Sequence, residues 1–396
     1  MDVIMRCANV TKPEVALTSD CRLFDFLLYS VIGGSLCVFG VVGNALSFVV
    51  LQHKDNAKSA TPFLLRALAV ADSLVLLASV PLYALPPVYL FTGYLRIYND
   101  LYPIIMPFLW PLYLIPYTGT ILMTVLVSLE RYLAVCKPVM SVTLRSVEQS
   151  RRHVACVVLF AVLYNIPRFF EYHAVESCED QNTTKVSYEL SSFGHNKLYR
   201  IIYANLLYFI VMLGGPLLSL AFFNVKLITA LKAQKRRRRE MTRGCGGVSG
   251  GGGGGGHLQQ DLTLVLVVVI FAFSFCQTPT FIDHILWTFV DKEETNCGNW
   301  HYYYTAVADT LAILNSSINF IIYVLTSRKF RQGLVTLFAR TRRIGESGPV
   351  GALTPGGRSA LQGAAHHRLT DISVCPYQQD SEQNNPLFVG SDEGRL

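Results

Sequence analysis

The sequence predicts an all-α membrane protein, a bundle of seven transmembrane helices followed by a short amphipathic helix. Three observations support this fold class. Hydrophobic residues make up 51% of the 396 residues and charged residues only 15%, against about 25% charged in soluble proteins. Seven apolar stretches are each long enough to cross a bilayer, and the loops between them alternate in charge. A surface this apolar is stable only when lipid surrounds it.

The spans follow from their length and composition. A hydrocarbon core about 30 Å thick requires roughly 20 apolar helical residues for one crossing. The stretches that meet this requirement are Leu23–Leu51, Pro62–Leu90, Pro103–Val135, His153–Phe170, Leu198–Ile228, Leu262–Val290 and Tyr303–Val324. The first stretch is too long and too rich in glycine for a signal peptide, and no small-residue cleavage site follows it. We therefore expect it to remain as the first span.

The charges of the connecting loops predict the orientation, because cytoplasmic loops carry an excess of lysine and arginine. Basic residues follow the first, third, fifth and seventh spans and include the run Arg236–Arg239, whereas the opposite set of loops is acidic. The N-terminus is therefore predicted outside the cell and the C-terminus in the cytoplasm. The net charge of +7 comes mostly from the inner rim, so we expect no nucleic-acid partner for Arg236–Arg239.

Two other signals lie on the predicted outer side. Asn9 and Asn182 begin glycosylation acceptor sequences. Four cysteines also lie there, where disulfide bonds persist, and four cysteines allow three connectivities. They are Cys7, Cys21, Cys178 and Cys297.

Composition divides the chain into segments. Residues 1–22 are expected to form an extracellular N-terminus, and residues 23–326 the seven-helix domain. Within that domain, residues 229–260 read as a flexible cytoplasmic loop rich in glycine and arginine. Residues 327–343 place leucine and phenylalanine between basic residues, which predicts an amphipathic helix on the inner membrane surface. Residues 344–396 have the composition of a disordered cytoplasmic tail.

Polar residues inside the spans are costly and mark candidate functional sites. Asp72 lies in the middle of a span with no cation beside it in sequence. The polar residues expected to face it are Asn44, Thr120, Asn315, Ser316 and Asn319. Such a set suits a sodium ion at Asp72 or a water network. The alternative is a satisfied polar core that holds helices together.

Several motifs occur in register along the chain. They are Gly43-Asn44, Asp72 within LAVAD, Glu130-Arg131-Tyr132 at the end of the third span, and NFIIY at Asn319–Tyr323. Together with the seven spans and the amphipathic helix, they resemble the rhodopsin-like G protein-coupled receptors from about Leu23 to Arg340.

That resemblance implies an activation switch on the cytoplasmic side. Arg131 would pair with Glu130 at rest and reach Tyr323 and a heterotrimeric G protein on activation. The other members of the implied switch are Tyr132, Phe273, Pro279 and Asn319. The alternative is an inert ion pair whose arginine extends to the membrane surface.

Four positions depart from the family pattern. Met106 replaces the cysteine at the outer end of the third span, and Gln277 replaces the toggle tryptophan of the sixth. The proline after Asn319 and the tryptophan of the fourth span are also missing. Because Met106 cannot pair with Cys178, Cys178 must have another partner, and three connectivities of the four outer cysteines remain open. Of these we favour Cys21–Cys297, which would link the ends of neighbouring helices, together with Cys7–Cys178.

Two stretches resemble invertebrate receptors for FMRFamide and related neuropeptides, Tyr164–Tyr172 and Asn315–Tyr323. This resemblance implies a short peptide agonist that ends in Arg-Phe-amide. A buried peptide arginine requires a carboxylate, and Asp309 lies in the outer half of the last span without a basic neighbour in sequence.

Other residues of the outer half are expected to complete the ligand site. Four carboxylates would add negative potential at the entrance, namely Glu171, Glu176, Glu179 and Asp180. Aromatic and polar residues that suit a Phe-amide are Trp110, Tyr113, Tyr117, Tyr208, Gln277, His284 and Trp287. Each of these residues also has a structural role as an alternative to ligand binding. Tyrosine and tryptophan also populate membrane interfaces, and Glu171 has Arg168 as an alternative partner.

Other functions have less support. No nucleophile–base pair or metal-ligand set is visible, so we expect no enzyme, and the last span lacks the lysine of a retinal protein. Asp72 and Asp309 would suit an ion-coupled transporter, but nothing suggests paired halves. We expect a plasma-membrane receptor for a short amidated neuropeptide that signals through a G protein, with arrestin and a receptor kinase binding the tail. The alternative is a receptor for a different peptide or small ligand.

Overall fold

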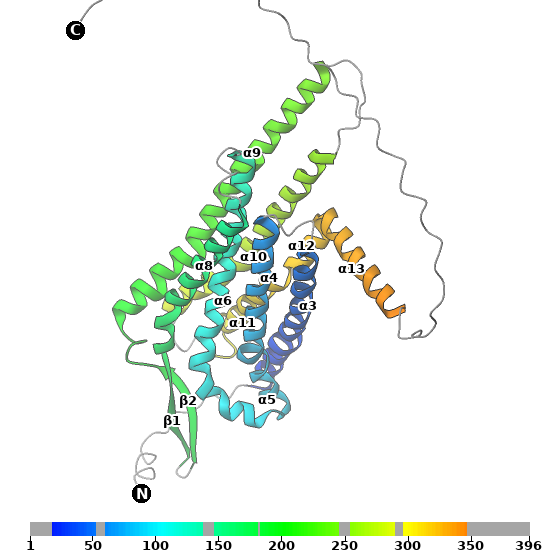
Figure 1. The fold of residues 1–396 in the computed structure, drawn as a ribbon. Coiled ribbons are helices and arrows are strands. Elements are labelled where there is room, and N and C mark those ends of the chain that lie inside the picture. Colours follow the sequence, from blue (N-terminus) through cyan, green and yellow to red (C-terminus); the bar gives the residue numbers. More distant parts are fainter. Residues whose placement is uncertain are drawn as a thin grey trace, which may run out of the picture. The chain divides into compact units, whose positions relative to one another are not determined.

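The computed structural model describes residues 18–52, 60–137, 146–180, 183–244, 254–289 and 296–346. Within them, seven long helical segments form a bundle (Figure 1). In chain order they are α2 (Ser19–Asp25), η2 (Phe26–Gly33) and α3 (Gly34–Leu51); α4 (Ala60–Ser79) and η3 (Val80–Ala84); α6 (Arg96–Cys136); α8 (Val147–Asn165) and η4 (Ile166–Phe170); η5 (Tyr199–Leu207), η6 (Phe209–Gly214) and α9 (Gly215–Gly244); α10 (Gly254–Phe289); and α11 (Trp300–Ser317) and α12 (Asn319–Thr326). The η segments are 3₁₀ or π turns that continue the helix beside them.

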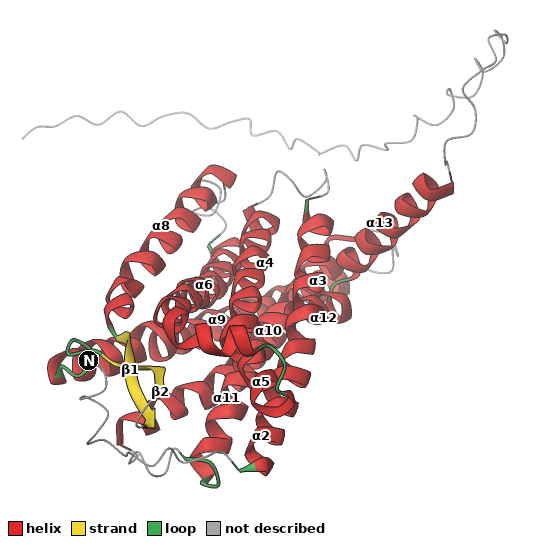
Figure 2. Ribbon diagram, turned by 90° about the horizontal axis from the view of Figure 1, so that it is seen from below, coloured by secondary structure: helices red, strands yellow, loops and turns green. Residues whose placement is uncertain are grey.

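The predicted spans are confirmed as helices. Among the described residues, five helices are long and apolar enough to cross a membrane, and the pair α11 and α12, bent by 48°, is a sixth candidate. The 36-residue helix α10 supplies the remaining segment. Helices make up nearly all of the described chain (Figure 2), which agrees with the predicted all-α fold class.

The predicted flexible loop, residues 229–260, differs from the structure at both of its ends. Helix α9 continues through the arginine run to Gly244, and α10 begins at Gly254. Lysine, arginine, glutamine and alanine are good helix formers, and each residue added to an existing helix gains a hydrogen bond. The helices on both sides therefore extend into residues 229–260, which their glycine content predicted as irregular.

Apolar and polar residues are distributed as in a protein surrounded by lipid. Large apolar side chains cover the outside of the helices; Val38 is 68% exposed and Phe271 73%. The interior instead contains Asn44, Asp72 and Ser316, which are almost fully buried. Backbone groups are hydrogen-bonded within the helices, as a hydrocarbon environment requires.

A β-hairpin that the sequence did not predict lies between the fourth and fifth segments. Strand β1 (Tyr172–Asp180) pairs antiparallel with β2 (Thr183–Leu190). The hairpin and the short helix α5 (Pro86–Thr92) lie at one end of the bundle, where α6 contacts both strands (Figure 1). This is the end predicted to face the outside of the cell.

The last described helix, α13 (Arg328–Glu346), starts at the opposite end of the bundle. Phe330 is buried against Tyr323, with ring centroids 5.6 Å apart, whereas Val335 and Phe338 are 68% and 56% exposed. The helix extends three residues beyond the predicted range 327–343 and has the predicted amphipathic character. Its position on the membrane surface stays a prediction.

One disulfide bond connects the outer ends of the first and last segments. Cys21 and Cys297 are bonded, with their Cα atoms 6.1 Å apart, which agrees with one of the two expected pairs. Cys7, Asn9 and Asn182 lie outside the described residues, and so does the side chain of Cys178. The second expected disulfide and the glycosylation sites therefore stay predictions, as does the tail, residues 344–396, beyond Glu346.

Candidate functional site

Two of the polar residues predicted to face Asp72, Thr120 and Asn319, donate hydrogen bonds to it. The Asp72 carboxylate is fully buried and accepts hydrogen bonds from Thr120 Oγ1 at 3.0 Å and Asn319 Nδ2 at 2.7 Å. Both partners come from other helices, α6 and α12. The carboxylate therefore connects three helices near the middle of the bundle.

Further polar groups line the same core. Asn44 Nδ2 donates to the Ser316 carbonyl oxygen at 3.1 Å, and Asn315 is buried one residue earlier. Asn44 Oδ1 is buried without a hydrogen-bond partner among the described residues, and the Ser316 hydroxyl lies within hydrogen-bonding reach of Asp72. Buried oxygens beside a carboxylate that lacks a counter-charge have the chemistry of a small-cation site or of a buried water site. The residues present therefore fit a sodium ion.

The cytoplasmic end of α6 holds a closed ion pair. Arg131 Nε lies 3.4 Å from Glu130 Oε2, and the same carboxylate oxygen accepts a hydrogen bond from Thr61 Oγ1 of α4 at 2.7 Å. Sequence inspection missed Thr61, although its position one residue into α4 would have placed it at the cytoplasmic rim. Tyr132 stacks against Phe223 of α9, with centroids 5.5 Å apart.

The other predicted switch residues are distributed along the sixth and seventh helical segments. Tyr323 and Phe273 are buried, at 5% and 2% exposure, and Pro279 lies inside α10. The last segment bends by 48° between α11 and α12 although Phe320 replaces the proline of the family motif. Ser317 Oγ donates to the Leu314 carbonyl oxygen just before the bend, and such back-bonding by serine bends helices.

On the outer side, Asp309 has a single hydrogen-bond donor among the described residues. Tyr29 of η2 donates its hydroxyl to Asp309 Oδ2 at 3.0 Å. No arginine, lysine or histidine in the described ranges forms an ion pair with Asp309. Tyr302 of α11 donates in return to Asp25, so two tyrosine–aspartate contacts run in opposite directions between the first and last segments.

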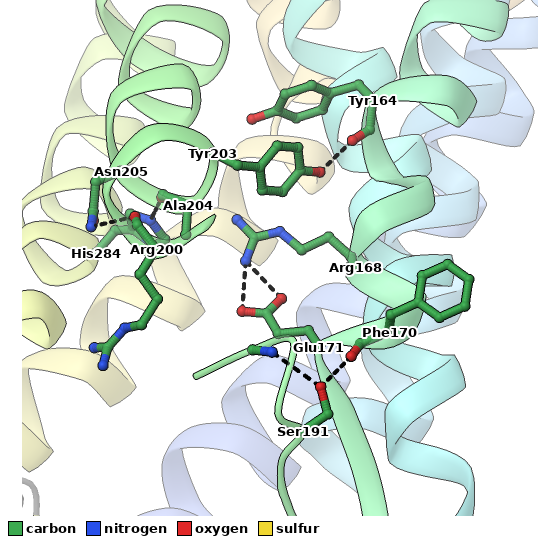
Figure 3. A network of polar contacts seen from close by, with 11 residues as sticks. Tyr164, Arg168, Phe170, Glu171, Ser191, Arg200, Tyr203, Ala204, Asn205 and His284 are labelled. Atoms are coloured by element: carbon green, nitrogen blue, oxygen red, sulfur yellow. Dashed lines mark hydrogen bonds and ion pairs between the residues drawn. The ribbon is translucent and has the colours of Figure 1, made fainter. Parts of the chain in front are cut away.

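Glu171 does not have the predicted role of an open entrance carboxylate. Its two oxygens accept from Arg168 Nη1 at 2.9 and 2.8 Å, and both side chains are buried (Figure 3). The Arg168 guanidinium lies 5.2 Å from the ring centroid of Tyr203. A buried carboxylate must be paired to avoid a large desolvation cost, and Arg168, three residues earlier, is within reach. Glu171 therefore pairs with Arg168, the alternative considered from the sequence, and the predicted entrance role of Glu171 is wrong.

This ion pair lies at the base of the hairpin. Ser191 N donates to the Glu171 carbonyl oxygen at 2.9 Å, and Ser191 Oγ donates to the carbonyl oxygen of Phe170 (Figure 3). Farther along, Tyr188 of β2 meets Tyr102 of α6, with centroids 6.1 Å apart. These contacts fix the hairpin to the bundle where Met106 excludes the usual disulfide bond.

Burial and the nearby Glu171 carboxylate raise the pKa of Tyr172, the first residue of β1, above its ordinary value. Its phenol therefore stays protonated at any physiological pH.

The remaining predicted ligand residues divide by burial. Tyr113, Tyr117, Tyr208 and Gln277 are buried in the bundle, at 3%, 2%, 8% and 3% exposure. His284 stacks on Tyr208 at 3.8 Å between centroids, and Trp110 stacks on Tyr113 at 6.0 Å. Trp287 and Glu176 are exposed on the outer side, and the side chain of Glu179 lies outside the described residues.

A second polar contact on the outer side was missed by sequence inspection. Asp283 of α10 accepts from Thr305 Oγ1 at 2.6 Å and lies 3.5 Å from His301 Nε2 of α11. His301 is fully buried. Asp283 lies one residue before His284, but adjacent residues of a helix do not face each other, and His284 stacks on Tyr208 of the fifth segment instead.

The bundle of apolar helices thus has a closed ion pair at one end and, toward the other, a carboxylate without a cationic partner in the described part of the chain, an arrangement that suits a membrane receptor. The profile of the 7 transmembrane receptor (rhodopsin family) matches residues 43–323, and the chain belongs to this family. Its members are receptors rather than enzymes, as expected. The family and the apolar helices together make it a multi-pass protein of the plasma membrane.

Similar curated proteins are peptide receptors. The FMRFamide receptor of Drosophila melanogaster is 28% identical over 338 residues, which are 85% of this chain and 57% of the fly protein. An FMRFamide peptide receptor of Caenorhabditis elegans is 28% identical over 306 residues, 76% of this chain and 66% of the worm protein. Neuromedin-U receptor 2 of Mus musculus is 25% identical over 334 residues, 83% of this chain and 80% of the mouse protein. The chain thus spans less than two thirds of the two FMRFamide receptors.

Proposed function

We propose that this chain is a neuropeptide receptor whose agonist is a short amidated peptide with a cationic residue near its amide, of the FMRFamide type. Binding outside the cell would be passed to a heterotrimeric G protein inside. The observation that carries the proposal is Asp309, a carboxylate in the outer half of the bundle with a tyrosine hydroxyl but no cation as its partner among the described residues.

The electrostatic argument is specific to Asp309. Glu171 already has Arg168, and Asp283 has His301 and Thr305, so these carboxylates have partners in the chain. A ligand guanidinium at Asp309 would supply the positive charge that no described residue of the chain supplies to this carboxylate. A hydrogen bond to a charged group contributes about 1.5–3 kcal/mol, or roughly a tenfold to hundredfold change in affinity.

The cytoplasmic end supports G protein coupling. The pair Glu130–Arg131 is closed and bound to Thr61, and a closed pair can exchange partners when helix packing changes. Arg131→Ala is expected to abolish signalling and spare peptide binding. Binding of arrestin and a receptor kinase to the tail, and an extracellular N-terminus, are parts of the same proposal.

The test compares two aspartates on the same pair of helical segments. Asp309→Asn and Asp25→Asn are expressed in cells, and calcium or cAMP responses are measured against a panel of amidated peptides that includes FMRFamide-like and neuromedin-like sequences. For an active arginine peptide, Asp309→Asn should lower potency roughly tenfold to hundredfold. Asp25→Asn should have little effect, because Asp25 lies nearer the outer surface and binds Tyr302.

Replacing the peptide arginine with citrulline, its neutral isostere, isolates the charge. Wild-type protein should lose potency with the citrulline peptide, and Asp309→Asn should not distinguish the two peptides. Unchanged arginine potency in Asp309→Asn, or an acidic peptide as the best agonist, would overturn the assignment of Asp309. A neuromedin-like agonist would keep the receptor function and change the ligand class.

The polar core is proposed to hold a sodium ion that favours the resting packing. Asp72 would supply the charge and Asn44 and Ser316 the neutral oxygens. Replacing sodium with a bulky organic cation should raise ligand-free nucleotide exchange in wild-type protein and leave Asp72→Asn unaffected. Equal responses in both proteins would exclude sodium from this core.

A further inference from the structure

A continuous series of tyrosine rings runs inward from Asp309. Tyr29, which donates to Asp309, stacks on Tyr83 with centroids 5.8 Å apart and planes 16° apart. Tyr83 meets the edge of Tyr113 at 5.6 Å, and Tyr113 stacks on Tyr117 at 5.4 Å. These rings come from η2, η3 and α6, so the series crosses three of the seven helical segments.

The series ends on α10. The Tyr117 hydroxyl donates to Gln277 Oε1 at 2.6 Å, and both side chains are about 97–98% buried. Gln277 lies two residues before Pro279, which is inside the helix. A proline removes a backbone hydrogen bond and allows the helix to bend there. The aromatic series therefore joins the outer carboxylate to the bendable segment of the sixth helix.

The contact between Tyr117 and Gln277 is suited to two alternative arrangements. In the structure Gln277 Nε2 is buried without a hydrogen-bond partner, so the closed contact satisfies one end of the amide only. A buried hydrogen bond stabilises one packing, and an unsatisfied donor penalises it. A shift of α10 would break the Tyr117–Gln277 hydrogen bond and allow the Gln277 Nε2 group to find new partners. The loss and the gain offset each other, so the two packings can be close in free energy.

We propose that the series Tyr29–Tyr83–Tyr113–Tyr117 couples occupancy of Asp309 to the bend of α10, with the Tyr117–Gln277 hydrogen bond holding the resting packing. This inference rests on the proposed function, because it takes Asp309 as the site of the ligand cation. A cation at Asp309 displaces the Tyr29 hydroxyl; Tyr29 then repacks against Tyr83, and the shift reaches Tyr117. Gln277 thus acts as a positioning residue at the place where the family pattern has a tryptophan.

The competing role for these side chains is packing alone. Removal of the Tyr117 hydroxyl would then lower thermal stability without changing the balance of conformations. The two roles are separated by measuring conformation in the absence of ligand and G protein, which also keeps the test independent of the proposed agonist.

The experiment uses Tyr117→Phe and Gln277→Leu, each of which removes the hydrogen bond and keeps the volume nearly constant. Tyr164→Phe is the matched control, because the Tyr164 hydroxyl is buried without a hydrogen-bond partner and its ring remains. Spin labels at Cys136 of α6 and at an introduced F271C of α10, in a background without other reactive cysteines, report the distance between the two helices in lipid nanodiscs.

In Tyr117→Phe and Gln277→Leu, the population with the longer distance should rise roughly twofold to tenfold, the shift expected from the loss of one hydrogen bond. The double variant should show no larger shift than either single variant, because both remove the same contact. Tyr164→Phe should match the wild type. Unchanged distances in both single variants, an equal shift in Tyr164→Phe, or additive shifts in the double variant would each overturn the proposal.

A final variant tests the middle of the series. Tyr83→Leu should keep peptide binding within about threefold and lower the maximal nucleotide exchange at saturating peptide, because the ligand site remains and its connection is cut. Full exchange in Tyr83→Leu would show that the series does not carry the signal. If no peptide activates the wild type, the proposed function fails, whereas the distance measurement still decides the role of the Tyr117–Gln277 contact.

Discussion

At the scale of single residues, the closed ion pair depends on a threonine. Thr61 is 3% exposed and donates to the oxygen of Glu130 that also faces Arg131. Two groups from two helices, the Thr61 hydroxyl of α4 and the Arg131 guanidinium of α6, therefore share one carboxylate oxygen. Because Thr61 belongs to α4, its hydrogen bond ties the end of α6 to a neighbouring helix and stabilises the resting arrangement of Glu130.

Thr61→Val removes this donor and keeps the shape of the side chain. Ligand-free nucleotide exchange should rise about twofold to tenfold, since the net contribution of one hydrogen bond is about 0.5–1.5 kcal/mol. Thr310→Val is the control, because the buried Thr310 hydroxyl donates to Ala306 of its own helix. Basal exchange in Thr61→Val equal to that of the control would remove Thr61 from the resting pair.

At the scale of helices, α3 packs unusually close to its neighbours. A Cβ atom at Gly40 would lie 2.5 Å from Leu76 Cδ1 of α4 and 2.9 Å from the Ser317 backbone of α11. Small residues permit such contacts between transmembrane helices. The backbone at Ser317 lies next to the bend of the last segment, so this contact also places that bend.

Gly40→Ala should therefore lower the thermal midpoint measured in detergent, by a destabilisation of about 1–3 kcal/mol from overpacking. Gly119→Ala is the matched change, because a Cβ atom at Gly119 of α6 meets nothing within 4 Å. Alanine at that helical position should be neutral or stabilise by up to about 1 kcal/mol. A Gly40→Ala protein as stable as Gly119→Ala would show that the helices can move apart without cost.

At the scale of the whole molecule, the disulfide bond Cys21–Cys297 links residues 276 positions apart in sequence. It joins the outer ends of the first and last segments, where Tyr29–Asp309 and Tyr302–Asp25 also cross. The bond thus holds the two helices that supply Asp309 and its tyrosine partner.

Mild reduction should lower the thermal midpoint of the detergent-solubilised protein, in line with the 2–5 kcal/mol that a disulfide bond typically contributes. Cys297→Ser should have the lower midpoint without reductant. Any further loss in that variant under reductant would report a second disulfide bond, as expected for Cys7–Cys178. A wild-type midpoint that reductant leaves unchanged would contradict an oxidised Cys21–Cys297 pair.

Periodic and compositional features of the sequence were sufficient for the fold class and for the polar core. Apolar length predicted the spans, since a bilayer fixes how long each must be, and the cost of a charge in lipid marked Asp72 and Asp309. The Glu130-Arg131-Tyr132 motif was among those that indicated the receptor family. Only the tertiary structure decided pairings between segments far apart in sequence: Thr61 with Glu130, Tyr29 with Asp309, and Tyr117 with Gln277.

The physical reason is the range of each effect. Hydrophobic length and intramembrane charge are properties of one segment, so the sequence alone determined where helices lie and which polar residues must face inward. Hydrogen bonds depend on contacts within about 3 Å between different helices, and helix packing sets these. The sequence offered Arg168 as a local partner of Glu171, and the structure decided for that pairing. The lack of a cation beside Asp309 in the described residues appeared only once the bundle was assembled.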